Sequence, residues 1–441
     1  MSTESLWLIG SALTGALFSS FFSCLPALHI TNVAGLFMVW VLRIQGTIPH
    51  EALAGFMLGL VVGYAVLNTI PSVFWGAPDE STVFIVWPGQ KYLMQKRGFE
   101  ASALTGIGSL GGLFALLILA PFLPKVLPTV RAVLTPHLHW ILAAVTVFML
   151  MTEWPKGSDR GRTGLVRFLN AWQSLGAGLL TFLLSGILGF VLLNSNLIPA
   201  EMASQKLMPA LIGLFGIPWV LQNILSRVRA PTQELSRSVD LTPLLILRGV
   251  GAGAFGGLFA AFFPAVTGGI GAFLAGHATA QRDDRLFLIS QGASKVVYYV
   301  GAFLFFFVPG SHLTRGGMAG MLSAFYTPYT PTVYWGAIAA MLLAGSMAFI
   351  LLLWLSRVSA WLVTRVDYRW ISALTLMLLV GFVLAFTGWE GLLVAMIATG
   401  IGLVPVLWGS RRMNCMGVLL LPLIGQWTGL SPWVAGWFGL K

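Results

Sequence analysis

The chain has 441 residues, of which 57% are hydrophobic and only 9% are charged. About 25% of the residues of an average soluble domain are charged, so this composition excludes a soluble globular protein. If each membrane crossing uses about 20 apolar residues, the length allows roughly a dozen crossings and leaves no room for a separate soluble domain. The sequence therefore predicts an all-α polytopic membrane protein.

The formal net charge of +11 does not indicate a nucleic-acid partner. The Lys and Arg residues are scattered between apolar runs and form no basic stripe. Positive residues in short loops set the orientation of membrane proteins, so we expect the basic clusters to face the cytoplasm. The nearly uncharged loop at His312–Arg315 is then expected outside. The basic clusters lie at 91–97, 156–167, 227–237, 357–369 and 411–412.

Roughly 11–13 apolar segments follow one another along the chain, and several are interrupted by proline or glycine. They lie near 5–24, 27–44, 52–75, 101–122, 130–151, 165–195, 207–226, 241–276, 286–309, 331–356, 370–388, 391–409 and 413–438.

An internal repeat is the most informative feature of this series of apolar segments. Residues Gly15–Pro26 align without a gap with Gly253–Pro264, at an offset of 238 residues. Each copy is a helix rich in small residues that stops at a proline. The basic loop at 91–97 has a charge-poor counterpart at His312–Arg315, which indicates opposite orientations. We predict two inverted repeats with broken or re-entrant helices, an architecture typical of secondary transporters. The first half is 1–226, the cytoplasmic linker is 227–240 and the second half is 241–441.

The two prolines that end these helices mark the expected substrate site. Irregular backbone at membrane depth is tolerated only where it is buried in protein or lines a cavity. A half-helix that starts there offers the positive end of its dipole to an anion. A plain kink, relieved by neighbouring helices, is the alternative. The expected substrate-binding residues are Pro26, His29, Thr31 and Asn32 in the first repeat and Pro264, Thr267, Gly268 and Gly269 in the second.

The stretch Asn68–Gly89 contains three prolines and cannot form one continuous helix. Asp79 and Glu80 lie between apolar runs, where ionisable residues are costly enough to be treated as functional. The alternative is a polar loop that caps a helix beginning at Ser81. We expect substrate contacts from Asn68 and Thr69, and coupling or gating by Asp79, Glu80, Ser81 and Thr82.

Gln291, Ser294 and Lys295 interrupt an apolar helix in the second half and are expected to contact the substrate. A lone intramembrane lysine needs an anionic partner, a cavity or a route to the interface. Lys295 is expected to pair with a substrate anion or with Asp79 or Glu80. A coupling Na⁺ or H⁺ is the only cofactor that we expect.

Enzyme signatures are weak in this chain. His50 and Glu51 lack the second histidine of a zinc-binding helix, and the two cysteines show no metal-ligand spacing. The aspartate pair within 282–285 resembles a diphosphate site only superficially, because an arginine flanks each aspartate. We expect no metal site, and a membrane-embedded lipid-modifying enzyme is the lesser alternative.

The run Asn68–Gly112 resembles the large permease subunit of the tripartite tricarboxylate transporters, particularly its archaeal-type, stand-alone branch. The matching residues are Pro71, Gly76–Glu80, Pro88–Gly89, Arg97–Ala101 and Gly108–Gly112, and further similarity covers Met208–Pro218, Gly253–Gly271 and Gln291–Gly317.

The resemblance implies a multi-pass permease of the cytoplasmic membrane that moves a tricarboxylate or related organic anion by alternating access. It implies coupling to a proton or sodium gradient, and a small membrane subunit and a substrate-binding protein as partners. The chain departs from the family pattern in two places. Ala27 follows Pro26 where the family usually has glycine, and Ser294–Lys295 stands where a pair of the Asn-Thr type is expected.

Pro264–Gly269 is also similar to a motif of polyprenyl-phosphate translocases. A membrane lipid with one phosphate would suit a site with few intramembrane cations. A lipid-phosphate flippase is therefore the alternative function.

Overall fold

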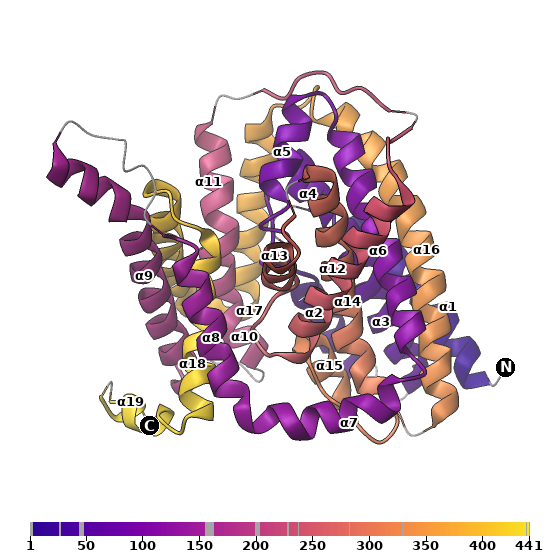
Figure 1. Cartoon of the computed structure of the whole chain (residues 1–441). Helices are drawn as coiled ribbons and strands as arrows, with labels where there is room; N and C mark the ends of the chain where they lie inside the picture. The colour runs from indigo at the N-terminus through magenta and orange to yellow at the C-terminus, as the bar shows by residue number, and fades with distance from the viewer. Residues whose placement is uncertain are drawn as a thin grey trace. The chain divides into compact units, whose positions relative to one another are not determined.

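The computed structural model describes residues 3–25, 28–43, 48–154, 163–198, 203–226, 229–236, 238–281, 283–328, 330–437 and 439–440. Within these residues the regular secondary structure is helical and contains no strand (Figure 1). This confirms the predicted all-α fold class. The chain forms two compact units, and each unit combines a segment from each predicted half. Unit 1 comprises Met1–Arg131 and Ser226–Ile371, and unit 2 comprises Ala132–Leu225 and Ser372–Lys441.

Unit 1 contains α1 (Thr3–Phe22), α2 (Ile30–Arg43), α3 (His50–Leu67), α4 (Thr69–Phe74), α5 (Val86–Met94), α6 (Gly98–Leu119), α12 (Pro243–Phe262), α13 (Gly268–Ala278), α14 (Asp284–Phe307), α15 (Gly316–Ser323) and α16 (Pro331–Leu362). Unit 2 contains η1 (Thr135–His137), α8 (Leu138–Met151), α9 (Gly164–Asn194), α10 (Ala203–Leu211), the π-helix η2 (Ile212–Gly216), α11 (Ile217–Leu225), η3 (Arg412–Met416), α18 (Gly417–Trp427) and α19 (Ser431–Trp437). Two of the three unit boundaries fall within α7 (Leu123–Leu134) and α17 (Tyr368–Leu407), and the third follows the end of α11.

Nine helices in the described part of the chain are long and apolar enough to cross a membrane, or ten if the bent pair α18 and α19 counts as one span. The protein is therefore a multi-pass membrane protein. The number is below the predicted 11–13 segments for four reasons. The segment 286–309 forms α14, which is not counted among the nine, and the segment 413–438 forms the bent pair. The segments 370–388 and 391–409 both belong to α17, which is interrupted at the non-helical Gly388. The segment 27–44 forms α2, whose 14 residues fall short of the roughly 20 that a crossing needs.

A stripe of glycines joins α1 and α3. Gly55, Gly59 and Gly63 lie one turn apart on α3 and face α1. A Cβ atom at Gly59 would lie 2.0 Å from the carbonyl oxygen of Ala12, so only glycine permits this close approach. Such small-residue stripes let membrane helices pack backbone against backbone. Because successive contacts advance in the same direction along both helices, α1 and α3 run parallel.

The same construction recurs in the second half of the chain. Gly249, Gly253 and Gly257 of α12 face α14 at positions that also advance in parallel. In each half, a short helix, α2 or α13, therefore comes between two parallel long helices in the sequence. The unit boundaries at Arg131 and Ile371 are 240 residues apart, close to the 238-residue offset of the sequence match. These features agree with an internal repeat, and its inverted relation remains a prediction.

The two ends of unit 1 are distinguished by the helices that begin at each. At one end Lys91 Nζ lies 2.5 Å from Asp284 Oδ2, and Arg285 pairs with Asp240. This end gathers the basic 91–97 cluster and the start of α12, and α5 lies there in Figure 1. At the opposite end Tyr334 Oη donates to the Ala120 carbonyl oxygen at 2.8 Å. Since α16 begins here and its Gly336 lies beside the start of α1, α1 and α12 begin at opposite ends.

Most residues of α14 are buried, and α14 is not among the nine apolar spans although its 24 residues are long enough. It carries Gln291, Ser294 and Lys295, each at most 1% exposed. These polar side chains are shielded from lipid because other helices of unit 1 surround them. A buried helix can therefore carry polar residues at membrane depth.

Candidate functional site

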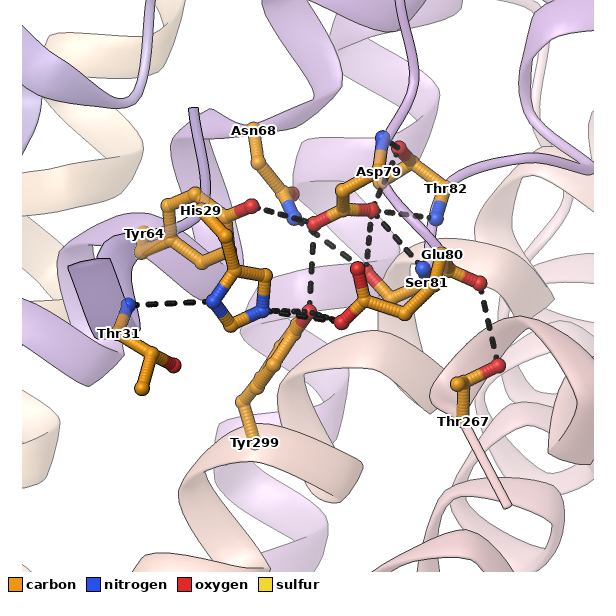
Figure 2. A network of polar contacts seen from close by, with 10 residues as sticks. All are labelled: His29, Thr31, Tyr64, Asn68, Asp79, Glu80, Ser81, Thr82, Thr267 and Tyr299. Atoms are coloured by element: carbon orange, nitrogen blue, oxygen red, sulfur yellow. Dashed lines mark hydrogen bonds and ion pairs between the residues drawn. The ribbon is translucent and has the colours of Figure 1, made fainter. Parts of the chain in front are cut away.

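A cluster of polar side chains lies inside unit 1, where several helix ends meet (Figure 2). It is built from the start of α2, the junction of α3 and α4, the loop 77–85, the start of α13 and the middle of α14. The sequence interrupts its helices at these places with proline, glycine and polar residues. The cluster is therefore a consequence of the breaks in the helices.

One oxygen of Asp79 organises the loop that carries it. Asp79 Oδ1 accepts hydrogen bonds from the amide and hydroxyl groups of both Ser81 and Thr82, at 2.8–2.9 Å. Ser72 of α4 donates in turn to the Thr82 hydroxyl at 2.8 Å. Ser81 and Thr82 are fully buried. The carboxylate thus ties the loop into a compact turn and fastens it to α4.

The other oxygen of Asp79 joins the loop to two helices (Figure 2). Asp79 Oδ2 accepts from Tyr64 Oη at 2.5 Å and Asn68 Nδ2 at 2.9 Å, both from the end of α3. Tyr299 Oη of α14 lies 3.2 Å from the same oxygen and 3.1 Å from Glu80 Oε1, so the two carboxylates share its single hydrogen. Because hydroxyl and amide donors surround both oxygens, the ionised form of Asp79 is strongly favoured by hydrogen bonding.

Glu80 has a different environment. Its Oε1 lies 2.9 Å from His29 Nε2 and 3.1 Å from Tyr299 Oη. Its side chain is 20% exposed and that of His29 is 24% exposed. His29 Nδ1 accepts the Thr31 amide hydrogen at 3.1 Å, so the hydrogen of a neutral ring lies on Nε2 and points to Glu80. His29 therefore connects Glu80 to the first turn of α2.

Lys295 is fully buried and donates to three uncharged acceptors. Its Nζ reaches Val66 O at 3.2 Å, Asn68 Oδ1 at 2.8 Å and Thr69 Oγ1. Asn68 uses its amide nitrogen for Asp79 and its amide oxygen for Lys295, so it bridges the two charges. Of the two predicted acidic partners, Lys295 thus faces Asp79, through one intervening amide.

The start of α13 packs against the same loop. α12 ends at Phe262 and α13 begins at Gly268, so the chain is broken around Pro264. Thr267 caps α13 and donates to the carbonyl oxygen of Glu80 at 3.1 Å. Ala265 has φ 60°, a left-handed conformation that costs a non-glycine residue roughly 1–2 kcal/mol. Strain of this kind is concentrated at functional sites.

Close packing leaves no space beside the first glycines of α13. A Cβ atom at Gly268 would lie 2.9 Å from the Lys295 backbone, and one at Gly269 would lie 2.8 Å from the Ser81 carbonyl oxygen. Ser294 donates to the Gly268 carbonyl oxygen at 2.8 Å. The glycines therefore allow α13 to contact both α14 and the Asp79 loop.

The remaining predicted site residues have different positions. Gln291 lies one turn before Lys295 on the same face of α14, and its buried amide has no hydrogen-bond partner among the described residues. Such an unsatisfied buried group requires an explanation, and a bound ligand is one. Thr31 and Asn32 are in the first turn of α2 and half-buried. Pro26 lies outside the described residues.

A small cavity adjoins Asp79 at the end of α3. Its volume is about 10 Å³, and it is lined by Ser23, Leu25, Leu28, Tyr64, Asn68, Pro71, Ala77 and Asp79. This is about the space that one water molecule occupies. Water can therefore lie beside the Asp79 carboxylate.

Sequence reasoning missed two tyrosines of the site, Tyr64 and Tyr299. Helical spacing contained the signal, because Tyr64 lies four residues before Asn68 and Tyr299 four residues after Lys295. Residues four apart share a helix face, so both tyrosines could have been placed beside the predicted polar residues.

Comparisons with known proteins show the family of the chain. The model of the tripartite tricarboxylate transporter TctA family matches residues 9–417. An uncharacterized protein of Methanocaldococcus jannaschii is 25% identical over 418 residues, which cover 90% of this chain and 94% of that protein. No solved structure matches the chain. The family transports tricarboxylates together with substrate-binding and small membrane subunits. The match therefore favours transport over catalysis, and gives no support to the flippase alternative.

Proposed function

The chain belongs to the tripartite tricarboxylate transporter TctA family, and we propose that it is a secondary-active permease for an organic anion, a tricarboxylate or related carboxylate. We place it in the cytoplasmic membrane, with the 91–97 end of unit 1 facing the cytoplasm because of its basic cluster. It moves its substrate by alternating access and is coupled to an ion gradient.

Broken helices converge on one polar cluster inside the apolar unit 1, and this convergence is the main support for the proposal. Helix N-termini at membrane depth present amide groups and a positive dipole end, which secondary transporters use to bind anionic groups. The starts of α2 and α13 both belong to the cluster.

The cationic and polar groups of α14 complete the binding site. Lys295 supplies the single buried ammonium group of the cluster, and Gln291 supplies an amide with no partner among the described residues. In the present arrangement the hydrogens of Lys295 are directed at three protein acceptors. A substrate carboxylate therefore contacts Lys295 only after the α3–α4 junction moves away, as alternating access requires.

Two classes of partner follow from the family. A soluble substrate-binding protein would deliver the anion, and a small membrane subunit would accompany the permease. Co-purification of the chain with the products of neighbouring genes tests both partners, and recovery of the permease alone at full transport activity would contradict them.

Counterflow in proteoliposomes tests the transport function. Vesicles loaded with unlabelled citrate or succinate should exchange it for the labelled compound when they contain the wild-type protein. Lys295→Met, which keeps the length of the side chain and removes its charge, is expected to slow exchange by roughly tenfold or more, the effect of losing about 1.4 kcal/mol of binding.

Lys125→Met is the matched control, because Lys125 is exposed on α7 and lies outside the cluster. It should exchange at the wild-type rate. The proposed function is wrong if the folded wild-type protein exchanges neither compound. The assignment of the site is wrong if Lys295→Met behaves like Lys125→Met.

A further inference from the structure

We propose that the coupling ion is a proton, that Glu80 carries it, and that Asp79 is a fixed anion that stays charged throughout transport. This inference rests on the proposed function, because it assigns the coupling step of the same site. It separates two neighbouring carboxylates that the sequence alone leaves equivalent.

The two carboxylates differ first in their hydrogen bonds. Asp79 accepts six hydrogen bonds from Tyr64, Asn68, Ser81 and Thr82, and it shares the Tyr299 hydroxyl with Glu80. A carboxylate has about four lone-pair sites, so its acceptor capacity is filled. A proton on Asp79 would turn one acceptor into a donor that faces other donors. Protonation of Asp79 would therefore break the turn that holds the loop.

Glu80 is free of this constraint. One of its oxygens faces His29 and Tyr299, and its side chain is partly exposed. Within the described chain, no backbone amide donates a hydrogen bond to its carboxylate. Glu80 can therefore gain a proton without unfolding the loop, and solvent can reach it.

The charges around Glu80 favour one additional positive charge. The titratable or charged groups that face it or its neighbour Asp79 are His29 from the start of α2, Asp79 from its own loop, Tyr64 from α3, and Lys295, Tyr298 and Tyr299 from α14. Lys295 balances one of the two carboxylates, and His29 is neutral when it accepts the Thr31 amide hydrogen. One negative charge remains, and a single proton on Glu80 removes it.

A metal cation is the competing occupant. His29, Asp79 and Glu80 place one ligand atom each within 4.8 Å of one another, which is close enough for a cation site. The hydrogen bonds argue against it, because the lone pairs of Asp79 are filled and His29 Nδ1 is taken by an amide. Sodium also prefers oxygen ligands to imidazole, as hard cations do. Glu80 alone would be left to hold the ion.

Protonation of Glu80 also provides a link to the substrate. When the proton forms an O–H bond with Glu80, the His29 N–H loses its anionic acceptor, whereas the Tyr299 hydroxyl still has Asp79 within reach. The His29 N–H then becomes available to a carboxylate of the substrate, at the N-terminal end of α2. The proton leaves Glu80 again when the substrate leaves and the His29 N–H returns to the carboxylate. Proton and anion therefore bind together, and transport is symport.

Proteoliposomes that contain citrate or succinate separate coupling from transport. The wild-type protein should accumulate the labelled anion when a pH gradient is imposed, and its affinity should rise by roughly 5- to 150-fold between about pH 8 and about pH 5.5, the usual range of a coupling between two ligands. Glu80→Gln, which resembles the protonated side chain, should retain counterflow exchange but lose both responses to pH. Glu51→Gln, at the other end of α3, is the matched control and should keep both responses.

The outcomes distinguish the inference from the proposed function. If the wild-type protein exchanges neither anion, the proposed function and the inference fail together. If it exchanges the anion but accumulates it only under a sodium gradient, or if Glu80→Gln still responds to a pH gradient, only the inference fails. A second measurement needs no variant: citrate or succinate added to purified protein should cause proton uptake, visible with a pH indicator. Binding without proton uptake would overturn the inference.

Discussion

The contrast between the two neighbouring carboxylates predicts unequal effects on stability. In Asp79→Asn, one oxygen becomes an amide donor that faces the donors of Tyr64, Asn68 and Tyr299. Lys295 also loses the charge that balances it. Removing one partner of a buried charge pair costs about 3–5 kcal/mol. In Glu80→Gln, which resembles the protonated side chain, only the charge-assisted contact with His29 is weakened, so the cost is about 1 kcal/mol, one ordinary hydrogen bond.

Thermal unfolding of the purified proteins in detergent measures this difference. At about 2–4 °C per kcal/mol for large domains, Asp79→Asn should lower the apparent Tm by roughly 6–20 °C and Glu80→Gln by less than about 5 °C. The variants should be compared at one heating rate, since unfolding of such proteins is often irreversible. Equal losses, or a larger loss for Glu80→Gln, would refute the division into a fixed and a proton-carrying carboxylate.

Two further predictions concern packing and helix capping. Gly59→Ala should destabilise the protein by about 1–3 kcal/mol, because the added methyl group meets the α1 backbone, whereas Gly10→Ala, with no atom within 4 Å, should leave the Tm unchanged. Asp283 caps α14, and the hydrogen bond from the Arg285 side chain holds the pKa of this carboxyl group below its usual value. The ionised form therefore stabilises the fold above the ordinary pKa of aspartate, and this stabilisation is lost as the pH falls through the lowered value. Asp283→Ala should cost about 1 kcal/mol at neutral pH and little at about pH 3, and a pH-independent loss would contradict this.

The composition and the positions of helix-breaking proline and glycine residues were sufficient to predict the class of fold. Long apolar runs predict membrane helices because a helix satisfies its own backbone in lipid. The proline near position 264 and the glycines around it predicted the break between α12 and α13. The exact spans were harder to predict, since α14 is polar in its middle and is protected only by helices distant in sequence. Hydropathy alone therefore cannot show which helix is central.

The site was predictable as a set of residues but not as a set of interactions. Polar residues in apolar runs identified Asn68, Asp79, Glu80 and Lys295, which the structure brings together. Their pairing depends on the close approach of segments separated by more than 200 residues. Local sequence also gives Asp79 and Glu80 nearly identical surroundings. Only the folded loop shows that the first is enclosed by donors and the second faces His29.

The burial of Lys295 connects stability to transport. A buried ammonium group is tolerated when hydrogen bonds and a nearby opposite charge offset its lost hydration. In the present arrangement, Asn68 supplies a hydrogen bond and Asp79 supplies the nearby opposite charge. Any motion that opens the α3–α4 junction would therefore leave the Lys295 ammonium group without these compensating interactions. A substrate carboxylate can replace the lost contacts, and the empty site cannot. Under the proposed function, the same side chain therefore favours the present arrangement when no substrate is bound and permits the α3–α4 junction to open when a substrate carboxylate is present.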